Sequence, residues 1–191
     1  MNSSFDIEIE NALTVLKSVG VILYPTDTIW GLGCDATNET AVQKVYAIKN
    51  RPDTKSLIIL LADERELLHY VAAPDPAIFD FIAQQQRPTT IIFENAIALP
   101  DNVIAADGSI AIRIVNDTFC RHLIKRLRKP IVSTSANSSG QASPQNFSDI
   151  TETIKKSADY IVNWRQDEIR PQQASQIVRW NKDGTVTVLR S

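Results

Sequence analysis

The order of apolar and polar positions predicts helices and strands that alternate along most of the chain. Ile9, Leu13 and Leu16 repeat at helical spacing after Ser4, and Gly20 marks the end of this first helix. Short apolar runs predict strands, most of them buried, at residues 21–24, 57–61, 90–93, 110–115, 131–132 and 160–162. Further helices are expected at residues 38–48, 63–70, 75–82, 118–127 and 147–156, and a polar loop at residues 26–37.

The end of the chain follows a different pattern. Two strands, at residues 176–180 and 185–190, flank an Asp183-Gly184 turn and predict a hairpin. Because helices alternate with strands but the last two strands are antiparallel, we expect an α/β fold with a twisted mixed sheet and flanking helices. A length of 191 residues without an internal repeat or linker fits a single domain over residues 1–191.

Composition narrows the class of protein. Apolar residues make up 43% of the chain and charged residues 22%, and the net charge is −2, so no global attraction to nucleic acid is expected. No apolar run approaches the ~18 residues of a membrane span, and the start of the chain lacks the pattern of a signal peptide, which predicts a cytoplasmic protein. Cys34 and Cys120 form no C-x-x-C pair, so neither a metal site nor a disulfide framework is expected.

A polar, glycine-bearing segment, Tyr24 to Gly33, follows the first predicted strand. Thr26, Asp27 and Thr28 place two hydroxyls and a carboxylate at a strand end, which is a favoured ligand position in α/β sheets. The segment contains no Gly-Lys-Ser/Thr sequence and so is no P-loop. The alternative is an ordinary turn with local hydrogen bonds.

Two more segments could bind a charged or polar ligand. Lys49, Arg51 and Lys55 place three cations within seven residues, a pattern that suits phosphate, although cations at a helix end are usually solvated. Ser133 to Gly140 is rich in hydroxyl and amide side chains and could line a pocket or form a flexible loop.

Arg113 stands alone within the apolar run Ile110 to Ile114. It should therefore face the polar side of the sheet or a pocket, and if buried it needs an anionic partner, either a protein carboxylate or a substrate carboxylate. His69 and His122 have no motif context, and no G-x-S-x-G sequence indicates a nucleophilic serine.

Taken in order, the three segments resemble the YrdC-like family of threonylcarbamoyl-AMP synthases. The shared motifs are Y-P-T-D-T-x-x-G-L-G, K-x-R and S-x-S-A-N-x-S-G, and the resemblance extends from about Val21 to Arg190. It implies a YrdC-like fold around a concave basic cavity. It also implies a nucleotidyltransferase that converts L-threonine, bicarbonate and ATP, with Mg²⁺ on the phosphates, into threonylcarbamoyl-AMP and pyrophosphate. A tRNA-threonylcarbamoyl transferase machinery would use the product at position 37 of tRNA, with tRNA itself as a further candidate partner.

The resemblance also implies roles for individual residues. Lys49 and Arg51 would be catalytic. The residues that would contact threonine are Thr28, Arg113, Ser135 and Ser175. Those that would contact ATP are Arg51, Lys55, Ser109, Asn137 and Arg190.

The sequence departs from the family pattern at Leu60, where a histidine is common, and around Ser175. Two other functions stay open. One is a non-catalytic RNA-binding module with a basic concave face, against which the near-neutral charge weighs. The other is carbamoyl transfer, as the same domain performs within larger proteins.

Overall fold

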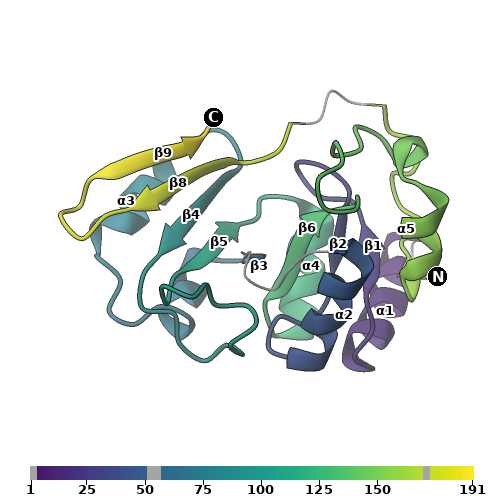
Figure 1. The fold of residues 1–191 in the computed structure, drawn as a ribbon, viewed down its shortest axis with the longest axis horizontal. Helices are drawn as coiled ribbons and strands as arrows, with labels where there is room; N and C mark the ends of the chain where they lie inside the picture. The colour runs from purple at the N-terminus through teal and green to yellow at the C-terminus, as the bar shows by residue number, and fades with distance from the viewer. Residues whose placement is uncertain (1–3, 51–56, 170–172) are drawn as a thin grey trace.

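The computed structural model describes residues 4–50, 57–169 and 173–191 and contains one mixed sheet with helices on both faces (Figure 1). The strands are β1 (Ile22–Tyr24), β2 (Gly31–Gly33), β3 (Ile58–Leu61), β4 (Thr89–Phe93), β5 (Ile110–Ile114), β6 (Ile131–Ser135), β7 (Tyr160–Ile161), β8 (Gln176–Trp180) and β9 (Val186–Arg190). The α-helices are α1 (Ser4–Lys17), α2 (Glu39–Lys49), α3 (Ala77–Gln84), α4 (Thr118–Leu127) and α5 (Glu152–Ser157). The 3-10 helices are η1 (Glu64–His69) and η2 (Phe147–Asp149).

The strand order is β7-β1-β2-β6-β3-β5-β4-β8-β9. Three neighbouring pairs are parallel, β1 with β7, β3 with β5 and β4 with β8, and the other five are antiparallel. The mixed α/β sheet that the sequence predicts is therefore confirmed, and so is the terminal hairpin of β8 and β9.

Alternation along the strands divides the core into two layers. On one face, Ile22 and Tyr24 of β1 pack with Leu13 of α1 and Phe119 of α4. On the other face, Leu23 belongs to the larger cluster that includes the apolar side of α2. Most of the strands read as continuous apolar runs because helices cover both sides of the sheet.

Some predicted boundaries were wrong. Residues 26–37 do not form one loop, because Gly31–Gly33 pairs with both β1 and β6 as strand β2. Asp117, not Thr118, caps α4, since its carboxylate accepts the Cys120 amide at 2.9 Å. The helix predicted at 147–156 is divided into η2 and α5, and strand β6 continues into the polar segment as far as Ser135.

Strand β2 fits between β1 and β6 because Gly33 has no side chain. A Cβ atom at Gly33 would lie 2.6 Å from Tyr24 Cε1 and 2.6 Å from the Val132 carbonyl oxygen. At Gly31, in the same strand, the nearest atom would be the Thr134 carbonyl oxygen at 3.3 Å. Close backbone approach is therefore required at Gly33 and much less at Gly31.

Neither cysteine has the environment of a reactive thiol. Burial raises the pKa of the Cys34 thiol well above its usual range, with Asp35 adding to the shift. Burial likewise raises the pKa of Cys120, and the nearby Asp117 charge raises it further. Among the described residues, no helix has the length and apolar character that crossing a bilayer would need.

We predict that Gly33→Ala lowers the free energy of unfolding by about 2 kcal/mol or more, because a backbone carbonyl on a central strand cannot move aside. Gly31→Ala is the matched control and should cost clearly less. Urea unfolding followed by circular dichroism measures both variants, and equal losses would contradict this account of β2.

We also predict that both thiols are inert in the folded protein. At pH 8 a thiol reagent such as DTNB should label neither cysteine in native buffer and should label both in denaturant, since the thiolate is the reactive form. A thiol that reacts within seconds under native conditions would contradict the burial of Cys34 or Cys120.

Candidate functional site

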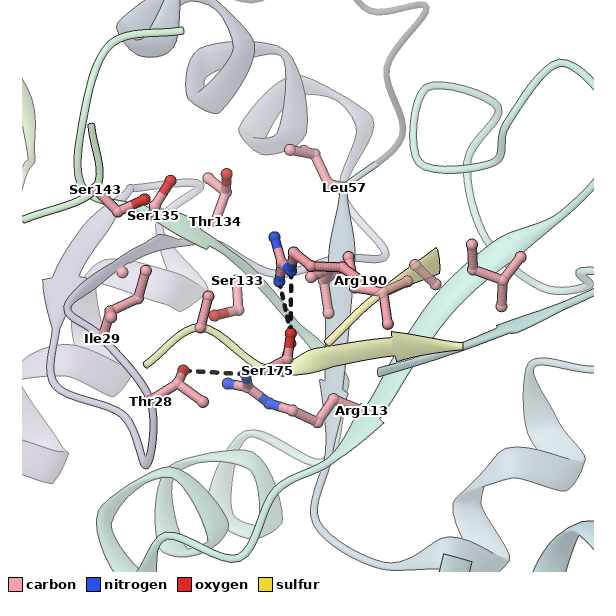
Figure 2. Close-up of a pocket in the computed structure, with 16 residues that line it drawn as sticks. Thr28, Ile29, Leu57, Arg113, Ser133, Thr134, Ser135, Ser143, Ser175 and Arg190 are labelled. Atoms are coloured by element: carbon pink, nitrogen blue, oxygen red, sulfur yellow. Dashed lines mark hydrogen bonds between the residues drawn. The ribbon is translucent and has the colours of Figure 1, made fainter. Parts of the chain in front are cut away.

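Residues from the first and third motif segments meet Leu57 and Ile58, which follow the second segment in the sequence, at a cavity of about 250 Å³ (Figure 2). Its lining is formed by Thr28, Ile29, Gly31, Leu57, Ile58, Ile92, Ala111, Arg113, Ser133, Thr134, Ser135, Ser143, Ala174, Ser175, Ile177 and Arg190. Two of these side chains are cationic, several carry hydroxyls, and none of the described lining residues is acidic. The cavity is therefore suited to a polar ligand that carries negative charge.

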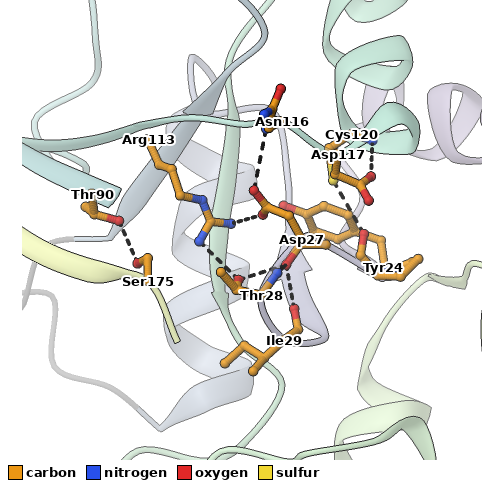
Figure 3. Close-up of polar contacts among 12 residues, drawn as sticks. Tyr24, Asp27, Thr28, Ile29, Thr90, Arg113, Asn116, Asp117, Cys120 and Ser175 are labelled. Carbon is orange, nitrogen blue, oxygen red and sulfur yellow. Dashed lines mark hydrogen bonds and ion pairs between the residues drawn. The ribbon is translucent and has the colours of Figure 1, made fainter. Parts of the chain in front are cut away.

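Arg113 enters the cavity from strand β5 and is only 3% exposed. Its Nη1 donates to Thr28 Oγ1 at 3.1 Å, and its Nη2 lies 3.2 Å from Asp27 Oδ1 (Figure 3). Its Nε is buried without a hydrogen-bond partner. The sequence predicted an anionic partner for this arginine, and Asp27 is that partner. Nη2 forms this ion pair without hydrogen-bond geometry, so both Nε and Nη2 lack a hydrogen-bond acceptor.

Arg190, at the end of β9, is the second cationic residue that lines the cavity. Its Nε and Nη2 donate to the Ser175 carbonyl oxygen at 3.2 and 2.8 Å (Figure 2). The pKa of Arg190 is lowered by burial and, to a lesser extent, by the positive charge of Arg113. Because the two arginines repel each other, an anion between them would be favoured by both.

Ser175 is fixed from the side of the sheet. Its hydroxyl lies 2.8 Å from that of Thr90, and both side chains are buried. The Ser175 carbonyl is thus held in position to accept the two hydrogen bonds from the Arg190 guanidinium. Thr90 has no signal in the sequence, because a threonine in a strand is ordinary.

The loop after β1 presents Thr28 in a fixed direction. Thr26 Oγ1 accepts the Thr28 amide at 3.0 Å, lies 2.9 Å from Thr28 Oγ1 and donates to the Ile29 carbonyl at 2.8 Å (Figure 3). Asp27 faces the same guanidinium, and its Oδ2 also accepts the Asn116 amide at 3.5 Å. The local turn that the sequence allowed is real, and it serves to orient Thr28 toward Arg113.

Lys49 joins the second motif to the third. It is 2% exposed, and its Nζ donates to the carbonyl oxygens of Ser135 at 2.5 Å and Asn137 at 2.7 Å, with Asn137 Oδ1 at 3.3 Å. The Ser139 amide donates to the Lys49 carbonyl at 2.7 Å. A cation at a helix end is usually solvated, but this one lies behind the cavity wall and holds the polar segment after β6.

The predicted site residues separate into four groups. Thr28, Arg113, Ser135, Ser175 and Arg190 line the cavity, and Lys49 and Asn137 lie next to its wall. Ser109 is outside the lining, and its buried hydroxyl donates to Asp107 at 2.5 Å. Arg51 and Lys55 lie outside the described residues.

Two larger cavities lack this combination of a buried arginine and motif residues. One of about 470 Å³ lies beside α3 and the start of α4, and one of about 520 Å³ lies beside Trp180 and residues 71–76. Neither combines a buried arginine that has an unfilled donor with the residues of the sequence motifs. Across the described ranges, no three His, Cys, Asp or Glu side chains are grouped as a metal site would require.

Known proteins resemble this chain over most of its length. Residues 14–191 match the family model Sua5_yciO_yrdC, described as telomere recombination. The threonylcarbamoyl-AMP synthase of Idiomarina loihiensis is 35% identical over 159 residues, which cover 81% of this chain and 84% of the relative. The enzyme of the same name from Pseudoalteromonas translucida is 34% identical over 155 residues, covering 80% and 83%.

The fold is also found among solved structures. P. abyssi Sua5 complexed with L-threonine superposes with a TM-score of 0.84 at 22% sequence identity, covering 100% of this chain and 55% of Sua5. The chain thus spans about half the length of that protein. At this identity the likeness concerns the fold alone, but the family model covers nearly all of the chain. The chain therefore belongs to the Sua5, YciO and YrdC family.

Proposed function

We propose that the protein is an L-threonylcarbamoyladenylate synthase, which makes threonylcarbamoyl-AMP and pyrophosphate from L-threonine, bicarbonate and ATP. The two curated relatives carry the name of this enzyme, and P. abyssi Sua5 has been crystallised with L-threonine. The name of a relative alone does not identify a reaction, and the proposal therefore rests on the chemistry of the cavity.

One observation carries the proposal: Arg113, whose Nε and Nη2 are buried without a hydrogen-bond partner, lines a cavity whose described lining is free of acidic groups. A threonine carboxylate is a planar, bidentate anion that would complete its hydrogen bonds. The hydroxyls of Thr28 and Ser175 border the same space and can bind the polar groups of the amino acid.

The nucleotide would lie toward the polar segment after β6 and toward Arg190. Asn137 lies on this side, next to the cavity wall, with its amide donating to the Gln141 carbonyl at 2.5 Å. We assign the phosphates to Arg51 and Lys55 from the K-x-R motif, and Ser109 to the nucleotide from the resemblance alone. Lys49 would act through the segment that it holds.

The chemistry needs positioning and charge neutralisation more than a protein nucleophile. The threonine amine attacks bicarbonate-derived carbon dioxide to form a carbamate, and the amine proton goes to solvent. A carbamate oxygen then attacks the α-phosphorus of ATP, the bond to the β-phosphate oxygen breaks, and pyrophosphate leaves. Cations near the phosphates stabilise the charge that develops in this nucleotidyl transfer, and bound geometry replaces random encounter.

The oxygen donors of the cavity fit Mg²⁺ only in part. The described lining offers hydroxyls and no carboxylate, so the ion would be held mainly by ATP phosphates and water, and would neutralise phosphate charge. The product would pass to a tRNA-threonylcarbamoyl transferase machinery in the cytoplasm, which modifies position 37 of tRNA.

We predict that the pure protein releases pyrophosphate from ATP only when L-threonine and bicarbonate are both present, as measured by a coupled pyrophosphate assay. Arg51→Ala should lose at least about 100-fold in rate with an unchanged circular dichroism spectrum, because a bidentate phosphate contact is removed. Arg65→Ala, which removes an exposed arginine paired with Asp63, is the control. A fully active Arg51→Ala variant would disprove the phosphate assignment, and salt-dependent tRNA binding without turnover would favour the RNA-binding module.

Arg113→Gln should raise the KM for L-threonine by about 10- to 100-fold, which corresponds to the ~1.5–3 kcal/mol of a hydrogen bond to a charged group. L-Threoninol, which lacks the carboxylate, should not compete with threonine in the wild-type protein. Arg126→Gln, on the outer side of α4, is the control. An unchanged KM for threonine in Arg113→Gln would contradict this carboxylate assignment.

A further inference from the structure

Arg165 contacts the loop that carries Thr28 but does not line the cavity. It lies in the segment after β7, and its side chain is 19% exposed. Its Nη2 donates to the Thr26 carbonyl at 3.0 Å, and its Nη1 lies 2.6 Å from Asp117 Oδ2. One guanidinium therefore connects the loop after β1 to the start of α4.

The second anchor of Arg165 is itself fixed. Asp117 is buried and caps α4, with its Oδ1 accepting the Cys120 amide at 2.9 Å (Figure 3). Cys120 in turn donates its Sγ–H to the Pro25 carbonyl at 3.4 Å. The helix end and the loop thus form one hydrogen-bonded unit in which Arg165 supplies a positive charge next to a buried carboxylate.

The loop residue Thr26, which accepts the hydrogen bond from Arg165, is connected to the cavity through two short contacts. Thr26 Oγ1 accepts the Thr28 amide at 3.0 Å and lies 2.9 Å from the Thr28 hydroxyl. That hydroxyl accepts Arg113 Nη1 at 3.1 Å. If the Thr26 peptide moved, Thr28 would move with it. The Arg113 guanidinium, which is hydrogen-bonded to Thr28, would then be displaced as well.

The backbone of Arg165 has an unfavourable conformation that its contacts hold in place. Its φ is 57°, in the left-handed region that favours glycine, asparagine or aspartate. Such a conformation is unfavourable for a long side chain and persists only where surrounding contacts determine it. The contacts here are the ion pair with Asp117, the bond to Thr26 and a longer approach of Nε to Glu168 Oε2 at 3.7 Å.

We propose that Arg165 is a positioning residue of the amino-acid site, which sets the direction of Thr28 and of the Arg113 guanidinium without touching the substrate. The proposal concerns the threonine end of the cavity and rests on the proposed function for the identity of the substrate. The residues assigned to the nucleotide lie on other segments, so the positioning effect is confined to the amino acid.

The test separates positioning from stability with Arg165→Lys. A lysine keeps a positive charge beside Asp117, but its single ammonium cannot reproduce the fork that spans Asp117 and the Thr26 carbonyl. Arg165→Gln is the second variant, which loses the charge as well. The control is Arg126→Lys. Arg126 of α4 also forms ion pairs with two carboxylates, those of Asp6 and Glu10 in α1.

We expect Arg165→Lys to raise the KM for L-threonine about fivefold, the change that corresponds to one typical hydrogen bond. The KM for ATP should stay within about twofold, and the melting temperature should stay near that of the wild type, as the control also should. If the KM for threonine is unchanged in Arg165→Lys, or if both KM values rise together in Arg165→Gln as its stability falls, the proposal is wrong.

Amide hydrogen exchange gives a readout that does not depend on the reaction. Peptides that contain Thr28 and Ile29 should exchange faster in Arg165→Lys than in the wild type or in Arg126→Lys, because the Thr28 amide bond to Thr26 loosens. Unchanged exchange at Thr28 would overturn the positioning role even if the wild-type protein released no pyrophosphate. Absence of pyrophosphate release alone would overturn only the proposed function.

Discussion

The buried ion pair between Arg113 and Asp27 is the interaction on which the site depends. Removing a guanidinium from water is costly, and a buried arginine must recover that cost through partners. Asp27 and Thr28 supply part of this compensation at 3.2 and 3.1 Å, and Nε stays without a partner. The residues around Arg113 therefore satisfy its hydrogen-bonding groups only in part. The positively charged Arg190 lines the same cavity. A ligand carboxylate would complete this arrangement, which relates the fold directly to the proposed reaction.

The sheet explains how distant segments reach this cation. Strand β5 carries Arg113, the loop after β1 brings Asp27 and Thr28, and β6 brings Ser135. The terminal hairpin completes the site, because Arg190 of β9 is tied to the Ser175 carbonyl at the start of β8. Each contribution comes from a strand or from a loop next to one, so the cavity has rigid support on several sides.

Part of this site could be predicted from local signals in the sequence, whereas Ser175 and Arg190 were expected only from the family resemblance. Arg113 interrupts an apolar strand pattern, and a cation in that position must face a polar partner or a pocket. The strand before Tyr24 and the asparagine cap of α2 likewise follow from neighbouring residues. Strand β2 could not be predicted, since Gly-Leu-Gly has a weak strand preference and gains its pairing from β1 and β6. The burial of Lys49 and the contact of Arg165 with Thr26, which is 139 positions away, depend on tertiary packing alone.

A crystal structure of the protein with L-threonine and a non-hydrolysable ATP analogue would test the central claim most directly. We expect the threonine carboxylate within hydrogen-bond distance of the Arg113 guanidinium, beside Thr28, and the nucleotide toward Asn137 and Arg190. Threonine bound in another cavity, or bound with its carboxylate away from Arg113, would contradict the central claim.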